Sequence, residues 1–468
     1  MIFTELRFVL FLATVFCVHW TLRSNRTRKL WLLLVSYGFY SIWDWRFLGL
    51  IILSTLVDYV AGQQIHRSEA PRRRKLWLGV SLVVNLGLLG TFKYLDFFRE
   101  STAAMLELFG FDPHMESLGW ILPVGISFYT FQTLSYSLDI YFRRLKPVDG
   151  LLDLATFVAF FPQLVAGPIV RASDFLPQLA TRRAFSFEKV RPLLLLFLVG
   201  FFKKACVSDN ITGYVDAFYS APESYSFLAT WMGMLMFSVQ IYCDFSGYSD
   251  MAIACSGLLG YQLRLNFDFP YLRSNIQEFW RTWHMSLSSW LRDYVYIPFG
   301  GNRGTRWFTN RNLLLTMLVA GVWHGAGWTF VLWGLLHGLA LVAYREYRQA
   351  VPAPPAPRAS GIALAVVANF LFVTFAWVLF RAGDFSIAKT ITLNAVGLGA
   401  NPSAHAVAGP FAIFSCLALL HLVAWKRFLR PWIERSSDWI FAVGYGMAFP
   451  CALALMNGSV KPFIYFQF

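Results

Sequence analysis

Apolar runs of about 17 to 25 residues recur along this chain of 468 residues, and they limit what it can fold into more than any other feature. A run of that length is what an α-helix needs to cross the hydrocarbon core of a bilayer. Hydrophobic residues make up 57% of the chain and charged residues only 14%, whereas a soluble globular domain carries about 25% charged residues. The sequence therefore predicts an all-α polytopic membrane protein, with residues 1–468 forming a single membrane-embedded domain.

Basic residues gather in short stretches between the apolar runs. The net charge is +14, but the Lys and Arg residues cluster in loops and do not spread over one face, which argues against a nucleic-acid partner. By the positive-inside rule these loops are cytoplasmic, and the spans between them then place the N-terminus outside. The expected early spans lie near residues 7–22, 30–45, 47–65, 76–93 and 122–141.

Residues 151–170 lie between two basic loops, so they are expected to dip into the membrane and return. Pro162 and the Gly167-Pro168 pair supply the turn. Spans near 192–208 and 225–243 follow, and the second is expected to end in YCDFSGYSDMA. Asp244 and Asp250 within that motif are either acid–base partners or helix caps and solvated ends. Their spacing places them about 240° apart on a helix, on different faces.

His284 lies in the basic, cytoplasmic stretch 263–311. With Trp280, Leu287 and Leu291 it forms one stripe of a predicted amphipathic helix, which turns the histidine toward the membrane surface or the protein interior. Arg281, Ser288 and Arg292 lie on the adjacent flank. The alternative is an interfacial helix whose tryptophans sit among lipid headgroups and to which the histidine adds little.

His324 lies in a stretch without Asp, Glu, Lys or Arg from Asn312 through Tyr344. An ionisable side chain inside such a segment is costly and suggests a functional site. Gly321, Gly325 and Gly327 favour a broken or hairpin helix with His324 near mid-membrane. A single long tilted helix and a merely structural, hydrogen-bonded histidine are the alternatives.

The C-terminal part begins with a stiff proline-rich linker at 351–357. Spans near 361–380, 409–425 and 438–456 follow, which leaves the C-terminus outside. The aromatic tail 457–468 ends in KPFIYFQF. Free termini are usually polar and frayed, so this tail is expected to dock.

Several familiar signatures are missing. The chain lacks G-x-x-x-x-G-K-[ST], G-x-S-x-G and H-E-x-x-H, and none of its eight histidines is followed by aspartate five positions on. The six cysteines contain no C-x-x-C pair, so neither a disulfide framework nor a metal site is predicted. Charges within the spans are scarce, Asp58 being the clearest, whereas an ion-coupled transporter usually needs more.

One set of motifs, taken in order, resembles the membrane-bound O-acyltransferase family, in particular its bacterial branch that O-acetylates alginate, cellulose or peptidoglycan. The motifs are PVGISFYTFQTLSYSLDIY, FFPQLVAGPIVR, YCDFSGYSDMA, FWRTWHMSLSSWLRDYVYIPFGG, VWHGAGW and PFIYFQF. The resemblance implies a ring of about ten to twelve transmembrane helices, with re-entrant segments, around a central funnel. It also implies a bacterial inner-membrane location.

For the site, the resemblance implies that His324 is catalytic and that His284 lines the same tunnel. Further donor or tunnel candidates are Arg281, Arg292, Trp283, Ser288, Asp293, Trp323 and Asp244. No bound cofactor is expected; the donor is a cytoplasmic thioester, acetyl-CoA. The acyl group then passes outward to an extracytoplasmic acetyltransferase partner resembling SGNH hydrolases, within a polysaccharide synthesis complex.

Two roles stay open at the level of the residues. Arg281 and Arg292 either hold donor phosphates or bind anionic membrane lipids. Tyr465, the only side-chain hydroxyl in the terminal KPFIYFQF, is either a transient acyl carrier or part of a docking peptide. A transporter of polysaccharide or lipid, and an export-complex scaffold, are the rival functions without chemistry.

Overall fold

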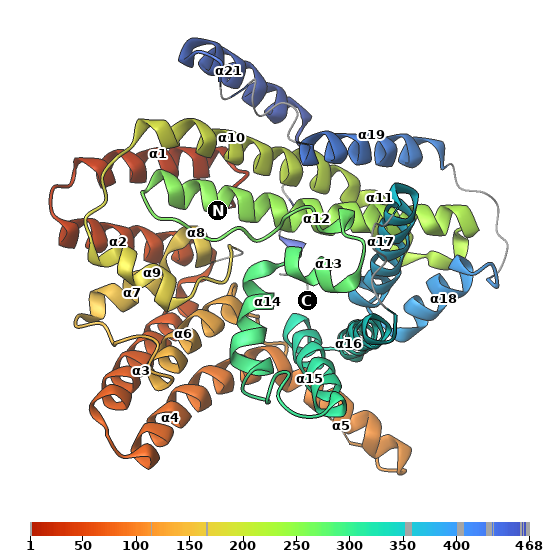
Figure 1. Cartoon of the computed structure of the whole chain (residues 1–468), viewed down its shortest axis with the longest axis horizontal. Helices are drawn as coiled ribbons and strands as arrows, with labels where there is room; N and C mark the ends of the chain where they lie inside the picture. The colour runs from red at the N-terminus through yellow and green to blue at the C-terminus, as the bar shows by residue number, and fades with distance from the viewer. Residues whose placement is uncertain are drawn as a thin grey trace. The chain divides into compact units, whose positions relative to one another are not determined.

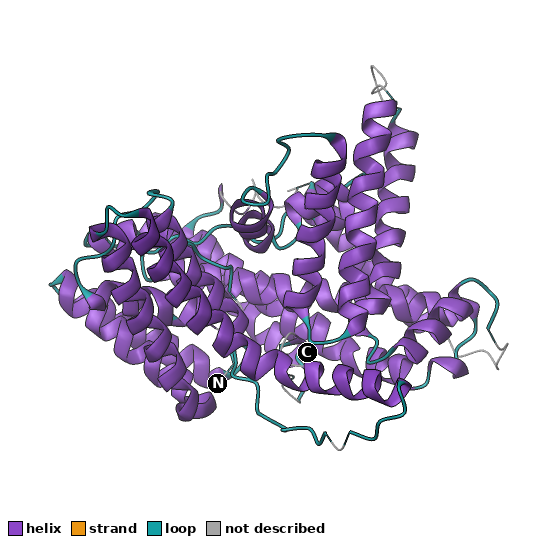
Figure 2. Ribbon diagram, turned by 90° about the horizontal axis from the view of Figure 1, so that it is seen from below, coloured by secondary structure: helices purple, strands orange, loops and turns teal. Residues whose placement is uncertain are grey.

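The computed structural model describes residues 2–113, 115–164, 167–351, 358–399, 407–426, 433, 435–458, 461 and 463–464. These residues form helices joined by loops and turns, and no strand occurs among them (Figure 2). The all-α prediction is confirmed. The chain divides into two compact units, one of residues 1–197 with 251–264 and one of 198–250 with 265–468. How the units are arranged, and with it the expected ring around a funnel, stays a prediction.

Among the described residues, the first unit begins with six helices, five of which match the predicted early spans, whereas the fifth in order, Leu95–Leu108, was not predicted (Figure 1). Among them α3, α4 and α6 pack against one another. Their bounds are α1 Leu6–Thr21, α2 Asn25–Asp44, α3 Leu48–Arg67, α4 Pro71–Leu89, α5 Leu95–Leu108 and α6 Ile126–Tyr141.

Where α3, α4 and α6 meet, the carboxylate of Asp58 is fully buried. It accepts hydrogen bonds from Ser81, from Ser137 at 2.9 Å and from the Asn85 amide at 2.9 Å. A buried charge is tolerated when several donors compensate the lost hydration, so Asp58 ties three helices together.

The break expected within 151–170 is confirmed. Helix α7 (Leu151–Ala159) ends where Phe160 turns to ψ 107°, and the four-residue α8 (Phe161–Leu164) follows. Every residue from 154 to 164 is buried. The next helix of the described chain is α9 (Ala172–Ala180).

The second unit begins at Leu198, within α10 (Val190–Phe201), and holds most of the later helices; residues Met251–Arg264 belong to the first unit. Helix α10 passes through a π-helical segment, Phe202–Ser208, into α11 (Asp209–Ser220). The others are α12 Phe227–Leu258, α13 Ile276–Thr282, α14 Met285–Leu291, α15 Arg306–His324, α16 Trp328–Ala350, α17 Ala359–Arg381, α18 Phe385–Ala395, α19 Ala408–Trp425 and α21 Asp438–Leu455.

The predicted end of the 225–243 span was wrong. Helix α12 continues through YCDFSGYSDMA to Leu258. Asp244 and Asp250 are 2% and 8% exposed, and each forms an ion pair with a lysine. They are therefore neither caps nor solvated ends, because the lysines supply the compensation that permits burial.

Five helical stretches of the described chain are long and apolar enough to cross a membrane: 25–67, 71–108, 359–381, 408–425 and 438–455. Helix α19 has a mean hydropathy of 1.8 in that window and buries none of its side chains. Such an apolar outer surface is suited to lipid, as expected of a multi-pass membrane protein. Residues 352–357 of the predicted linker and residues 459, 460, 462 and 465–468 of the tail lie outside the described residues.

Candidate active site

His324 is the last residue of α15, and the chain reverses immediately after it. Gly325 and Gly327 are both extended, and α16 begins at Trp328. The hairpin prediction is confirmed, and the single long helix is wrong.

Two glycines let the arms of this hairpin touch. A Cβ atom on Gly321 would lie 3.1 Å from the Cα atom of Gly334, and one on Gly334 would lie 3.2 Å from the Cα atom of Gly321. Only glycine permits backbones to approach this closely. The contact fixes the end of α15, and with it His324, three residues after Gly321.

The imidazole of His324 is 2% exposed and lies among aromatic rings. Its centroid is 5.0 Å from that of Trp323, 5.0 Å from that of Trp333 and 5.2 Å from that of Phe380, each at a steep angle. This environment is apolar and excludes bulk water. Electrostatic interactions are stronger in such an interior than in water.

The single amphipathic helix predicted around His284 was wrong. The segment forms two short helices, α13 and α14, and His284 between them adopts φ 44° and ψ 54°. A non-glycine residue in this left-handed region is strained, and such strain is common at functional sites. The expectation that His284 faces inward is confirmed, since its side chain is fully buried.

Asn266 sets the tautomer of His284. The side-chain oxygen of Asn266 accepts the backbone N–H of Ser286 at 3.2 Å and the Ser286 hydroxyl at 2.9 Å, while its amide donates to the Ser249 hydroxyl at 3.1 Å. That same oxygen lies 3.2 Å from Nδ1 of His284. Because an amide oxygen only accepts, Nδ1 carries the proton and Nε2 of the neutral ring is left as the basic atom.

The two histidines meet in one buried cluster. Their ring centroids are 6.5 Å apart with the planes at 58°. The ring of Trp323 lies 6.0 Å from that of His284, and Phe245 contacts His284 edge-on at 4.6 Å. Two imidazoles, forty residues apart in sequence, thus share an apolar interior, an arrangement suited to acid–base chemistry on a substrate away from water.

The comparison with known protein families decides the class of this protein. Residues 146–382 match the model of the membrane-bound O-acyltransferase family. The chain belongs to the membrane-bound O-acyltransferase family. The resemblance seen in the motifs is confirmed, and the protein is an O-acyltransferase.

Several curated relatives are similar over most of their length. A peptidoglycan O-acetyltransferase from Helicobacter pylori is 38% identical over 81% of this chain and 75% of its own. A probable alginate O-acetylase AlgI from Azotobacter vinelandii is 40% identical, covering 83% and 76%. Another AlgI, from Pseudomonas putida, is 35% identical over the whole of both chains.

Some of the other predicted residues of this acyltransferase lie at the aromatic wall around the histidines, and others lie outside it. Trp323 and Trp283 belong to the aromatic wall, and the Trp283 ring lies 4.9 Å from that of Trp377. Ser288 is half-buried and donates to the carbonyl of Trp283 at 3.3 Å.

Arg281 and Arg292 have exposed side chains and lie outside the histidine cluster. Arg292 is held by Asp293 through two contacts, 2.7 and 3.1 Å long. Asp244 is buried and pairs with Lys204 at 2.5 Å.

Sequence reasoning missed the parts of the site that only packing brings together. Asn266 lies in a loop, and no helical periodicity in the sequence relates its position to that of His284. Phe245, Trp333 and Phe380 carry no signal beyond aromatic composition.

His337 lies in the same uncharged run as His324, on α16. It is fully buried beside Trp333 and Trp280, at 4.7 and 5.2 Å between centroids. Neither of its ring nitrogens has a hydrogen-bond partner within the described part of the chain. No three His, Cys, Asp or Glu side chains of that part gather closely enough to hold a metal ion.

Proposed function

We propose that this protein takes an acetyl group from acetyl-CoA in the cytoplasm and passes it across the bacterial inner membrane for O-acetylation of an exported polysaccharide of alginate or cellulose type. Support comes from relatives named alginate O-acetylase and peptidoglycan O-acetyltransferase. With the basic loops in the cytoplasm, both termini lie on the outer side of the membrane.

The observation that carries the proposal is the buried pair His284 and His324, with Asn266 fixing the tautomer of the first. Thioester transfer requires a hydroxyl oxygen to attack the acyl carbon. The C–O bond forms, the C–S bond breaks, and the hydroxyl proton leaves while the CoA thiolate gains one. An imidazole is the side chain best matched to take that proton at neutral pH. His324 is the general base, and Nε2 of His284 assists in the same interior.

Substitution of each histidine tests these roles. His324→Ala removes a polar group from an apolar segment, so folding and expression stay near normal while transfer falls about 100- to 10,000-fold. His284→Ala also loses activity, less completely. Purified protein in nanodiscs is given acetyl-CoA and a polysaccharide acceptor system, and CoA release is measured. If the His324 variant keeps more than about a tenth of the rate, the general-base role is wrong.

The same assay separates an enzyme from a transporter or scaffold. Neither rival releases CoA, and neither depends on the two histidines. If the chain with both histidines replaced by alanine still supports full acetylation of the polysaccharide, its function is one without chemistry.

We place the outward hand-off at Tyr465, which lies outside the described residues. A phenol loses its proton more readily than a serine hydroxyl and is the better leaving group in a second transfer. The acetyl group goes from acetyl-CoA to the Tyr465 oxygen, and then to an extracytoplasmic SGNH-hydrolase-like partner. Tyr465→Phe keeps the ring and removes the hydroxyl. Loss of polymer acetylation with the partner still bound supports the carrier; full acetylation leaves a docking peptide.

A further inference from the structure

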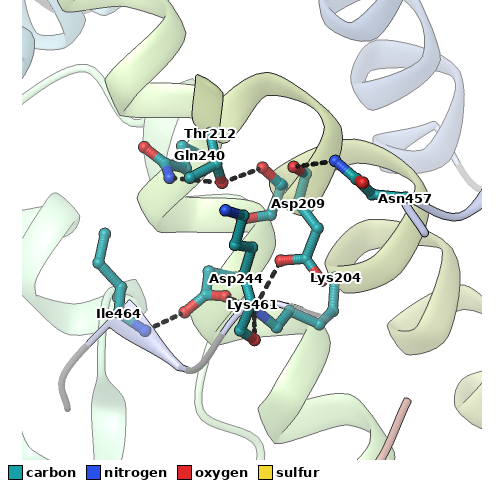
Figure 3. A network of polar contacts seen from close by, with 9 residues as sticks. Lys204, Asp209, Thr212, Gln240, Asp244, Asn457, Lys461 and Ile464 are labelled. Carbon is teal, nitrogen blue, oxygen red and sulfur yellow. Dashed lines mark hydrogen bonds and ion pairs between the residues drawn. The ribbon is translucent and has the colours of Figure 1, made fainter. Parts of the chain in front are cut away.

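A buried ion cluster in the second unit joins three elements. Lys204 lies in the π-helical segment, Asp209 begins α11 and Asp244 lies within α12. The ammonium of Lys204 is 2.7 Å from the Asp209 carboxylate and 2.5 Å from that of Asp244 (Figure 3). The three side chains are between 1% and 5% exposed, so they form an interior cluster.

Every member of this cluster also holds the C-terminal segment. The carboxylate of Asp244 accepts the backbone N–H of Ile464 at 2.9 Å. Lys204 donates to the backbone carbonyl of Lys461 at 3.3 Å, and the side chain of Asn457 donates to the backbone carbonyl of Asp209 at 3.2 Å. Figure 3 shows these contacts of Asn457, Lys461 and Ile464 with the cluster. Main-chain contacts of this kind fix the register of the tail, because a shift by one residue breaks them.

The net charge of the cluster of Lys204, Asp209 and Asp244 favours docking of the tail. One ammonium and two carboxylates leave a net charge of −1, and an uncompensated buried charge is strongly destabilising. The tail brings Lys461, whose ammonium interacts electrostatically with Asp209. Lys461 therefore adds a second positive charge in the neighbourhood of the two carboxylates, which favours docking of the tail at the cluster.

Aromatic contacts link the tail to the histidine cluster. Phe463 is fully buried, with its ring 5.4 Å from that of Phe245 and 5.2 Å from that of Tyr248. Phe245 follows Asp244 directly on α12 and contacts His284 at 4.6 Å. Only one ring therefore separates the held tail from His284.

We propose that Lys204, Asp209 and Asp244 are positioning residues: they clamp the C-terminal segment at Asn457, Lys461 and Ile464, and so hold Phe463 against Phe245, one ring away from His284. The inference rests on the proposed function for its catalytic consequence, but the clamp itself does not. It assigns Asp244, predicted as a donor or tunnel residue, to the tail.

A neighbouring ion pair offers a matched control. Lys203 lies in the π-helical segment beside Lys204, and Asp250 lies on α12 as Asp244 does. The two form an ion pair at 2.7 Å, and neither contacts the tail among the described residues. The test compares Asp244→Ala and Lys204→Met with Asp250→Ala and Lys203→Met. Lys461→Gln and Phe463→Ala weaken the clamp from the tail side, leaving the buried ions intact if the core variants do not fold.

Carboxypeptidase digestion with intact-mass analysis reads the clamp without any donor. In the wild type and the control variants, trimming stops before residue 464; in the clamp and tail variants it passes residue 461. In the transfer assay, clamp variants lose about 10- to 100-fold in kcat with an unchanged KM for acetyl-CoA. Lys204→Arg, which keeps the charge, restores part of both.

The outcomes separate the two proposals. Equal protection of the tail in all variants overturns the clamp, and so does a loss of kcat that only follows a fall in melting temperature shared with the controls. A wild type that protects its tail but releases no CoA leaves the clamp standing and overturns the proposed function.

Discussion

His284 Nδ1 lies 3.2 Å from the side-chain oxygen of Asn266, and both groups are fully buried. The contact orients the ring and decides which nitrogen is basic. It also joins the strained residue between α13 and α14 to the loop that follows α12.

Asn266→Ala removes the acceptor for His284 and Ser286 at once. We expect transfer to fall about 10- to 100-fold, because the ring is free to change tautomer and orientation, and the free energy of unfolding to fall by about 1–3 kcal/mol. The measurements are CoA release and chemical unfolding in detergent. Ser249→Ala, which breaks only the bond on the amide side, keeps most of the activity; an equal loss there would contradict the tautomer argument.

Gly334→Ala places a methyl group against the backbone of Met317 and Gly321. The arms of the α15–α16 hairpin must separate, so we expect a loss of about 1–3 kcal/mol in stability and reduced transfer, since His324 moves with α15. Gly361→Ala on α17 is the control, because nothing lies within 4 Å of its added carbon. Thermal unfolding and transfer rates compare the two, and identical behaviour would show that the glycine contact does not hold the hairpin.

Asp58→Ala leaves the donors Ser81, Asn85 and Ser137 without their shared acceptor. We expect a loss of about 2–4 kcal/mol in unfolding free energy, with normal KM and kcat per folded molecule, because the network lies in the first unit and not in the histidine cluster. Thr14→Ala, an exposed hydroxyl that bonds its own helix, leaves stability near normal. A selective loss of transfer with unchanged stability would instead give Asp58 a functional role.

Arg281 and Arg292 differ in their freedom to bind a donor phosphate. Arg292 is engaged by Asp293, whereas Arg281 shows no ion pair within the described part of the chain. Arg281→Gln should therefore raise KM for acetyl-CoA about two- to fivefold with little change in kcat, and Arg292→Gln should do so less. Initial rates against acetyl-CoA concentration give both constants. An unchanged KM, with binding to anionic vesicles reduced, would assign Arg281 to lipid.

Patterns in the sequence predict the class of the protein and the hairpin that carries His324. Long apolar runs permit only membrane-spanning helices, since a backbone in lipid must satisfy its own hydrogen bonds. The glycines around His324 predicted the hairpin because closely packed backbones leave no room for a side chain.

The surroundings of His284 and of Asp244 follow only from how the helices pack. The left-handed turn at His284, its bond to Asn266, and the pairing of Asp244 with Lys204 and the tail depend on residues brought together from distant positions. Helical periodicity is local: it places residues on a face but does not show which distant group will share a buried charge or accept a buried proton. Burial and hydrogen-bond satisfaction impose those partnerships only after the helices have packed.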